Sequence, residues 1–283
     1  RNLWISSLRN GVYKLAQSDG KGNFENITYF NKENGLSGNA IKKVFEDLEG
    51  NIWIATYGEG IDLITAKPLS NMEFDLEGID NDIQSIAATD NQTLYIGGIK
   101  GLFKFKKGMD RVPVRISGIP ADRITALYLE GTSLYIGTET NGLFRMDTRT
   151  SEIKKAKYEA YSMGNWVSTI ASDKTSIYAG TKDGIYQLDQ NLQQIEHFTT
   201  TNGLPHNNVE HILMDSKGRL LIATQANGIY GLVDGKISNL YSTGSEVKFR
   251  SIAEDDEGGI WAATYGDGVI LFKKDTLYQY TIP

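Results

Sequence analysis

The stretch EGNIWIATYGEGIDLI, residues 49–64, decides the fold, because a near copy, EGGIWAATYGDGVILF, occurs at residues 257–272. Five weaker copies occur elsewhere in the chain. Each copy has an apolar run, a short polar turn, a glycine and a second apolar run. The glycines that open the second run are Gly11, Gly60, Gly101, Gly142, Gly184, Gly228 and Gly268. Their recurrence every 40–49 residues predicts seven copies of one structural unit.

Short runs rich in Ile, Tyr, Trp, Val and Thr and bounded by Gly, Asn and Asp are typical of β-strands. Around the first quoted stretch we expect strands at residues 39–46, 51–56 and 60–64, and the last strand of the preceding unit at residues 25–30. These strands are apolar on both faces, so each sheet is expected to be covered on both sides. The pattern predicts an all-β protein, a seven-bladed β-propeller with four-stranded antiparallel blades.

The number of strands predicts an incomplete first blade. The outermost strand recurs seven times but the innermost strand only six times, because the sequence opens on the second strand of its first copy. We therefore expect residues 1–283 to be a single propeller domain that is a fragment of a longer protein. An open solenoid or two stacked sandwiches are the alternatives. Helical repeats are excluded, because no segment has apolar residues at helical spacing.

Composition narrows the classes of partner. The net charge is −6, the 283 residues include no cysteine, and no basic patch is visible, so nucleic acid is not an expected partner. Disulfides and thiolate chemistry are excluded. No apolar run approaches the ~18 residues of a membrane span. Phosphate-binding, dinucleotide-binding and serine-hydrolase motifs do not occur, and no cofactor is predicted.

Two copies extend the repeat upstream, and here the sequence resembles a known family. NGLSGNAIKKVFEDLEGNIWIATYGEGIDLI (34–64) and NGLPHNNVEHILMDSKGRLLIATQANGIYGL (202–232) are similar to the repeat of two-component regulator propellers. The resemblance implies the sensor domain of a Bacteroidetes-type hybrid two-component histidine kinase, on the periplasmic side of the inner membrane, that detects glycan fragments. It also implies a neighbouring propeller or β-sandwich domain, and a kinase activity that lies outside these residues. The chain itself is predicted not to be an enzyme.

In a four-stranded meander the links between blades and the turns between the second and third strands emerge on one face. Variable loops on a rigid scaffold are where recognition tends to lie. The candidate ligand-binding residues on this face are Tyr57, Glu59, Asp82, Arg123, Tyr161, Trp166, His206, Asn208, Lys248, Arg250, Tyr265 and Asp267. Such a mixed, hydrogen-bonding mouth suits a hydroxyl-rich ligand or an anionic sugar, so an oligosaccharide is the expected partner.

Trp166 is the leading candidate, because an aromatic side chain at a polar rim can stack on a sugar while its N–H finds an oxygen. The alternative is that it fills a gap in the channel or between blades. Trp4, Trp53 and Trp261 share one strand position and are predicted to be core, and Asp47, Asp215 and Asp255 are predicted to bond turn amides.

Two other functions are conceivable for a propeller of this kind. A propeller lyase needs a base and a metal at the mouth, but His206 and His211 point to opposite faces of an extended strand and cannot share a metal. No catalytic or metal-binding residue is predicted. The main alternative to a glycan sensor is a propeller that binds protein, including a second copy of itself as a homodimer.

Overall fold

A computed structural model describes residues 2–16, 26–47, 50–65, 70–72, 82–89, 93–106, 112–160, 162–226, 228–243, 247–273 and 276–280. Within these residues the chain forms seven antiparallel sheets and one short 3₁₀ helix, η1 (Lys32–Asn34). The protein is an all-β, seven-bladed β-propeller, as predicted, and each sheet is one blade.

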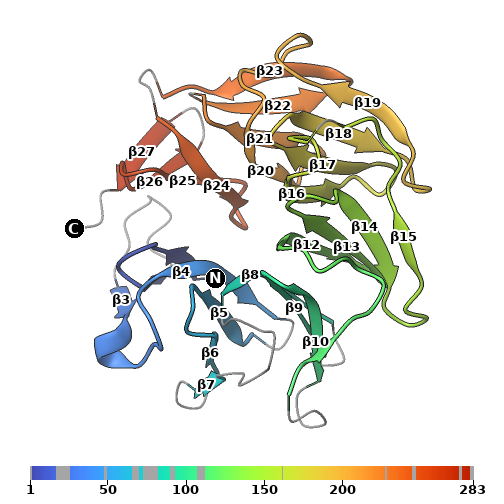
Figure 1. Ribbon diagram of the computed structural model, residues 1–283. Helices are drawn as coiled ribbons and strands as arrows, with labels where there is room; N and C mark the ends of the chain where they lie inside the picture. Colours follow the sequence, from blue (N-terminus) through green and yellow to red (C-terminus); the bar gives the residue numbers. More distant parts are fainter. Residues whose placement is uncertain are drawn as a thin grey trace. The chain divides into compact units, whose positions relative to one another are not determined.

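The strands of the seven blades follow one another in sequence (Figure 1). The first blade consists of β1 (Leu3–Ser6), β2 (Val12–Ala16) and β3 (Asn26–Phe30). The second consists of β4 (Ile41–Glu46), β5 (Ile52–Thr56), β6 (Ile61–Ile64) and β7 (Ser70–Met72). The third consists of β8 (Ile83–Ala88), β9 (Thr93–Gly98), β10 (Gly101–Lys106) and β11 (Val114–Arg115). The fourth consists of β12 (Ile124–Glu130), β13 (Ser133–Thr138), β14 (Leu143–Asp147) and β15 (Ile153–Lys155).

The last three blades have the same order. The fifth consists of β16 (Val167–Ser172), β17 (Ile177–Thr181), β18 (Gly184–Leu188) and β19 (Gln194–Phe198). The sixth consists of β20 (Val209–Met214), β21 (Leu220–Thr224), β22 (Ile229–Val233) and β23 (Lys236–Tyr241). The seventh consists of β24 (Phe249–Glu254), β25 (Ile260–Thr264), β26 (Val269–Lys273) and β27 (Thr276–Tyr280). The strands expected around the opening stretch are confirmed to within two residues, and the first blade has three strands.

The chain divides into two compact units, Arg1–Ile136 with Asp147–Ile153, and Gly137–Met146 with Lys154–Pro283. Blades one to three lie in the first unit and blades five to seven in the second. In the second unit, the first strands of successive blades, β16, β20 and β24, lie side by side (Figure 1).

The repeated glycine has a steric cause. All seven repeat glycines have positive φ, a conformation that other residues resist. At Gly184, with φ 101°, a Cβ would lie only 2.1 Å from the carbonyl oxygen of Phe198. The threonine before this turn is also structural, because the hydroxyl of Thr181 donates to the Gly184 carbonyl (2.9 Å) and accepts from the Asp183 amide (3.0 Å). The Thr-to-Gly spacing of the repeat is therefore a turn motif.

The core lies between neighbouring blades, as the two-sided apolar strands predicted. Tyr178 of the fifth blade packs with Ile212 of the sixth, and Leu221 of the sixth packs with Phe249 of the seventh. Inner strands are also joined by hydrogen bonds, such as that from the Ile212 amide to the Thr169 hydroxyl (3.2 Å). Burying such side chains removes water from apolar surface, which stabilises the stack of blades.

The N-G-L links are structural as well. Leu204 is buried, Gly203 has φ 120°, and the Asn207 side chain accepts from the Thr200 amide (2.8 Å). The Asn207 carbonyl accepts from the amide of Gly184 in the preceding blade (2.7 Å). Each such link therefore fastens one blade to the one before it.

The turn aspartates bond turn amides as predicted, and they have a second role. One oxygen of Asp255 accepts from the Gly259 amide (2.8 Å), and the other accepts from the Trp261 indole (2.9 Å). Asp47 holds Trp53 in the same way (2.8 Å). Trp53 and Trp261 are buried core residues, whereas Trp4, in the three-stranded blade, is only half-buried.

Candidate functional site

The innermost strands share a β-bulge after their first residue. The register shifts there in β4, β8, β16, β20 and β24. The residues that fall in the bulge are Lys42, Gln84, Ser168, Glu210 and Arg250. A bulge leaves one residue outside the ladder and re-aims its side chain. Each of these blades therefore has one side chain that is not fixed by strand pairing, and all of them except the buried Gln84 are half-buried.

The links and the turns share one face, as expected. The residue after the second strand donates its amide to the residue before the first strand of the same blade. Such bonds run from Tyr57 to Ala40 (2.9 Å), from Gln225 to Asn208 (3.3 Å) and from Tyr265 to Lys248 (2.9 Å). In the fifth blade Trp166 and Lys182 take the equivalent places, beside the pair Val167–Thr181. We call the nine positions of blades five to seven the rim: Trp166, Ser168, Lys182, Asn208, Glu210, Gln225, Lys248, Arg250 and Tyr265.

At the fifth blade the rim presents an aromatic–cation pair. Lys182 Nζ lies 3.0 Å from the centroid of the Trp166 ring, and both side chains are half-buried. The contact is a cation–π interaction. One face of the Trp166 ring is thus already covered by an ammonium group.

Ser168 and Glu210 connect the fifth, sixth and seventh blades. The Ser168 hydroxyl donates to the Val209 carbonyl (2.6 Å), directly beside Glu210. The Glu210 carboxylate then accepts from Asn208 Nδ2 (3.3 Å), Gln225 Nε2 (2.9 Å) and Arg250 Nη1 (3.4 Å). Its side chain is 13% exposed, against 39% for Arg250. Glu210 is therefore the shielded acceptor at the centre of the rim.

The seventh blade closes the rim with a second aromatic–cation pair. The Arg250 guanidinium carbon lies 5.2 Å from the centroid of Tyr265, and Arg250 Nη1 donates to the Tyr265 hydroxyl. Tyr265 is 45% exposed, and Lys248 is exposed beside it. The rim thus runs from Trp166 and Lys182, through amides and a carboxylate, to Arg250 and Tyr265.

Two further predicted residues flank the rim. His206 is exposed, and its Nδ1 accepts from the Asn208 amide (2.9 Å), which orders the link. Asp267 is exposed, and its amide donates to the Thr264 hydroxyl (3.0 Å). His206 and Asp267 are accessible, and the hydrogen bonds described here order their loops.

Other predicted residues lie in the first unit. Tyr57 pairs with Asp82 in an isolated antiparallel bridge, and Asp82 accepts from Gln84. Lys42 Nζ lies 5.4 Å from the Tyr57 centroid, which repeats the arrangement of Arg250 on Tyr265.

Glu59 is exposed in its turn, and its amide donates to the Thr56 hydroxyl (3.2 Å). The Arg123 amide donates to Asp122 Oδ1 (2.8 Å), and its side chain is half-buried. Tyr161 lies outside the described residues.

The prediction missed Lys182, Glu210 and Gln225 as members of one cluster. Lys182 and Gln225 follow the strand-ending threonine of their repeats, where Tyr57 and Tyr265 were chosen, so repeat alignment was a usable signal. Glu210 flanks the buried Val209 at the mouth end of its strand, as Asn208 does, so its place on this face was predictable. Its contact with Arg250 was not, because the bulge leaves no mark in the sequence.

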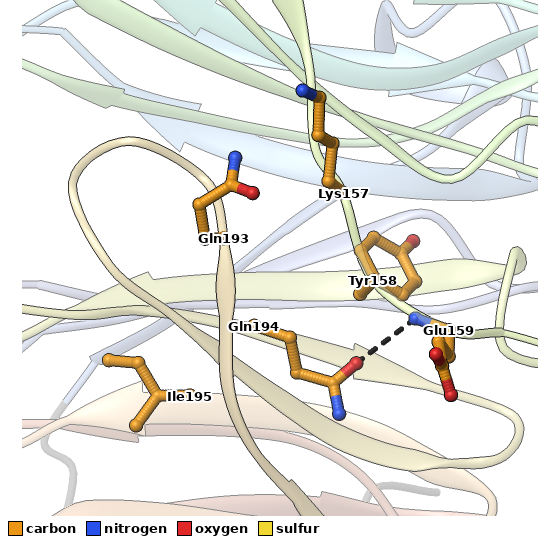
Figure 2. A pocket seen from close by; sticks show the side chains of 6 residues that line it. All are labelled: Lys157, Tyr158, Glu159, Gln193, Gln194 and Ile195. Atoms are coloured by element: carbon orange, nitrogen blue, oxygen red, sulfur yellow. Dashed lines mark hydrogen bonds between the residues drawn. The ribbon is translucent and has the colours of Figure 1, made fainter.

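A second polar feature lies at the outer edge of the fifth blade. Residues Lys157–Glu159, between β15 and β16, run alongside β19 through a parallel bridge between Lys157 and Gln193. Figure 2 shows the groove there, about 510 Å³, with the hydrogen bond from the Glu159 amide to the Gln194 side chain (3.1 Å). The groove is lined by Lys157, Tyr158, Glu159, Gln193, Gln194 and Ile195, none of which was a predicted site residue.

A cluster of aromatic rings lies at this edge, and the middle ring, Tyr186, is buried. Tyr186 stacks on His197, with ring centroids 4.0 Å apart. The Tyr158 ring also contacts Tyr186, with a centroid distance of 4.5 Å. Burial, with the nearby Asp183 charge, raises the pKa of Tyr186 to about 12, and burial raises the pKa of Tyr158 well above its usual value. Among the described residues, the Tyr186 hydroxyl is buried and has no hydrogen-bond partner. The raised pKa values keep both tyrosines neutral at physiological pH.

The described residues also bear on other functions. They contain no group of three His, Cys, Asp or Glu side chains placed to hold a metal ion. Among the same residues no helix has the length and apolar character needed to cross a bilayer.

The fold and the repeat define a class of protein. The two-component regulator propeller family matches residues 203–226, the N-G-L repeat of the sixth blade. The chain therefore carries a two-component regulator propeller repeat, and the resemblance noted from the sequence is confirmed. A comparison with curated proteins found no match.

Solved structures give more particular relatives. The extracellular domain of BT3049, a proposed hybrid two-component system of B. thetaiotaomicron, is 25% identical with a TM-score of 0.61, over 99% of this chain and 39% of its own. The extracellular domain of BT4673 from the same organism is 19% identical with a TM-score of 0.62, over 100% of this chain and 42% of its own. The chain thus spans about two-fifths of the length of these extracellular domains.

Enzymes share the architecture. Virginiamycin B lyase from Staphylococcus aureus has a TM-score of 0.71 at 12% identity, over 86% of this chain and 84% of its own. A likeness at this identity shows the fold alone.

Proposed function

We propose that the chain is the extracytoplasmic ligand-sensing propeller of a hybrid two-component system, that it binds an oligosaccharide at the rim, and that it is not itself an enzyme. The observation that carries the proposal is the rim, where the ends of β16, β20 and β24 bring Trp166, Asn208, Glu210 and Arg250 onto one face. The relatives named as extracellular domains of hybrid two-component systems support the sensory role and the location outside the cytoplasm.

The chemistry of the rim supports a sugar. Asn208 and Gln225 offer amide groups, Glu210 offers a carboxylate, and Trp166 and Tyr265 offer aromatic faces. Aromatic rings with a polar edge pack on the C–H face of a sugar, while amides and carboxylates bond its hydroxyls. The same residues would offer an apolar ligand little hydrophobic surface to pack against. The kinase that receives the signal would belong to another part of the full protein.

The test is thermal unfolding of the chain against a panel of neutral and acidic oligosaccharides. A ligand at about 100 times its dissociation constant adds roughly 2.7 kcal/mol of stability, which raises the melting temperature by a few degrees. Trp166→Ala and Asn208→Ala are expected to abolish the shift while folding normally. Val233→Ala is the matched control, because Val233 is a 40% exposed apolar residue at the end of β22, away from the rim.

A panel without any shift would contradict sugar binding and leave protein recognition, including a homodimer or a neighbouring domain, as the role of this face. Light scattering of the same samples then reads the oligomeric state. A shift that survives both rim substitutions would move the site elsewhere on the propeller.

A further inference from the structure

The rim carries a cation on an aromatic ring at each of its two ends. Lys182 lies on Trp166 at the fifth blade, and Arg250 lies on Tyr265 at the seventh. The two blades reach this arrangement differently, because the aromatic residue precedes the inner strand in one and follows the second strand in the other. The amides and the carboxylate of the sixth blade lie between the two pairs. The rim therefore has one charged group near each end and hydrogen-bonding groups in the middle.

Both cations have binding capacity left. Among the described residues, the contact of the Lys182 ammonium is with a π face and not with a carboxylate. Arg250 uses Nη1 for Glu210 and Tyr265, while a guanidinium has five N–H donors. Arg250 is 39% exposed and its Nη1 lies 3.4 Å from Glu210 Oε2, so its other N–H donors stay open to a ligand. An incoming anion could thus pair with either cation without breaking a buried ion pair.

Lys182 also makes stacking on Trp166 more favourable for an anionic sugar than for a neutral one. A neutral sugar that stacks on this face of Trp166 must displace the ammonium group and gives it no new partner. An anionic sugar draws the ammonium group to its own charge and clears the ring for stacking in the same movement. Charge recognition and stacking are then favourable together only for an acidic ligand.

We propose that the rim selects anionic oligosaccharides, with Lys182 and Arg250 each pairing with an acidic group of the ligand. The inference rests on the proposed function and adds the class of sugar and the residues that set it. Carboxylate and sulfate groups share the chemistry that these cations recognise. Exposed ion pairs of this kind are worth a factor of roughly two to five in an equilibrium constant, so two of them should favour an acidic ligand by about tenfold.

The experiment is calorimetric titration with matched pairs of ligands. The carboxylate arm compares tetragalacturonic acid with its full methyl ester, and the sulfate arm compares neocarratetraose sulfate with its desulfated form. The wild-type chain is expected to bind the acidic member of at least one pair about tenfold more tightly, with a preference that weakens as salt is added.

Lys182→Met and Arg250→Met should each reduce that preference by roughly twofold to fivefold. Lys182→Met should also bind the neutral member no more weakly than the wild type does, because the ring is then uncovered. Arg250→Lys should keep most of the preference. Lys217→Met is the control, because Lys217 is an exposed lysine in the turn between β20 and β21 and carries the same charge.

The outcomes separate the two proposals. Equal binding of acidic and neutral members, or a preference that neither methionine variant changes, overturns the selectivity while oligosaccharide binding stands. Failure of every sugar, acidic or neutral, overturns both. A preference that falls equally in Lys217→Met would be an effect of net charge and would also overturn the assignment to the rim.

Discussion

Replacing Asp215 by alanine tests how the blade turns are held. The Asp215 side chain is fully buried and accepts from the Lys217 amide (3.0 Å), the Arg219 amide (2.8 Å) and Arg219 Nε (2.7 Å). Arg219 Nη2 also lies 2.7 Å from the second carboxylate oxygen. The sixth blade has leucine where Trp53 and Trp261 occupy other blades, so the guanidinium takes the place of the indole.

The expected cost follows from these contacts. Two turn amides lose a charged acceptor at about 1 kcal/mol each, the lower end of the range because water reaches this turn. Arg219 is 22% exposed, so the loss of its ion pair is discounted to about 1–2 kcal/mol. Asp215→Ala should therefore destabilise the fold by about 3–4 kcal/mol. Asp215→Asn keeps an acceptor for the amides and should lose about 1–2 kcal/mol.

Urea unfolding followed by circular dichroism measures both values, and hydrogen exchange of β20 and β21 reports the loss locally. Asp267→Ala is the control, because Asp267 is exposed in a turn and its loss should change stability by less than about 0.5 kcal/mol. A free energy of unfolding of Asp215→Ala within about 1 kcal/mol of the wild-type value would refute the reasoning. So would an asparagine variant as unstable as the alanine variant, because the guanidinium contact would then carry the whole effect.

Two further predictions concern backbone strain and alkaline stability. Gly184→Ala should lower the melting temperature more than Gly235→Ala. A Cβ at Gly184 would lie 2.1 Å from the Phe198 oxygen, whereas none of the described atoms lies within 4 Å of a Cβ at Gly235. Both glycines have positive φ, which alone costs about 1–2 kcal/mol, so equal losses of stability in the two variants would contradict the steric argument. Burial raises the pKa of Tyr178 and of Tyr186 to about 12, and a hydrogen bond to Asp173 adds to the effect at Tyr178. In the unfolded chain the two tyrosines ionise near pH 10. They should therefore stabilise the fold below that pH, and this stabilisation should be lost as the pH rises to about 12. An ultraviolet titration in which every tyrosine of the folded chain is ionised at about pH 10.5 would contradict the raised pKa values.

Several parts of the fold could be predicted because local chemistry fixes them. The repeat glycines mark positions with positive φ that only a residue without Cβ occupies easily, and their spacing therefore marks the blades. The three turn aspartates were predicted to bond turn amides, and they do. Their second contacts, with Trp53, Trp261 and Arg219, were not predicted, because they depend on how far each side chain reaches back across its own turn.

The site was predictable only in part. Repeat position placed Trp166, Asn208 and Arg250 on one face, because link and turn residues must share an end of the sheet. Their mutual contacts depend on the bulge at Glu210, which is a feature of backbone register and not of residue type. The sequence suggested that Trp166 stacks on a sugar or fills a gap, and the structure places the Lys182 ammonium group over its ring. The pairing of β16 with β17 brings Trp166 and Lys182 together, and composition does not reveal that contact.

The repeated bulge also bears on how this surface can change over evolutionary time. The residues before the bulge in β4, β16 and β20 are Ile41, Val167 and Val209, all fully buried, whereas the bulge residues that follow are a lysine, a serine and a glutamate. Packing therefore restricts the residue before the bulge to an apolar side chain, while the bulge residue itself can be polar. A point mutation at a half-buried bulge residue such as Lys42 can change which chemical group a blade displays, while the buried residue before it keeps the strand in place. Successive blades provide several such sites, so new binding preferences can be assembled one substitution at a time.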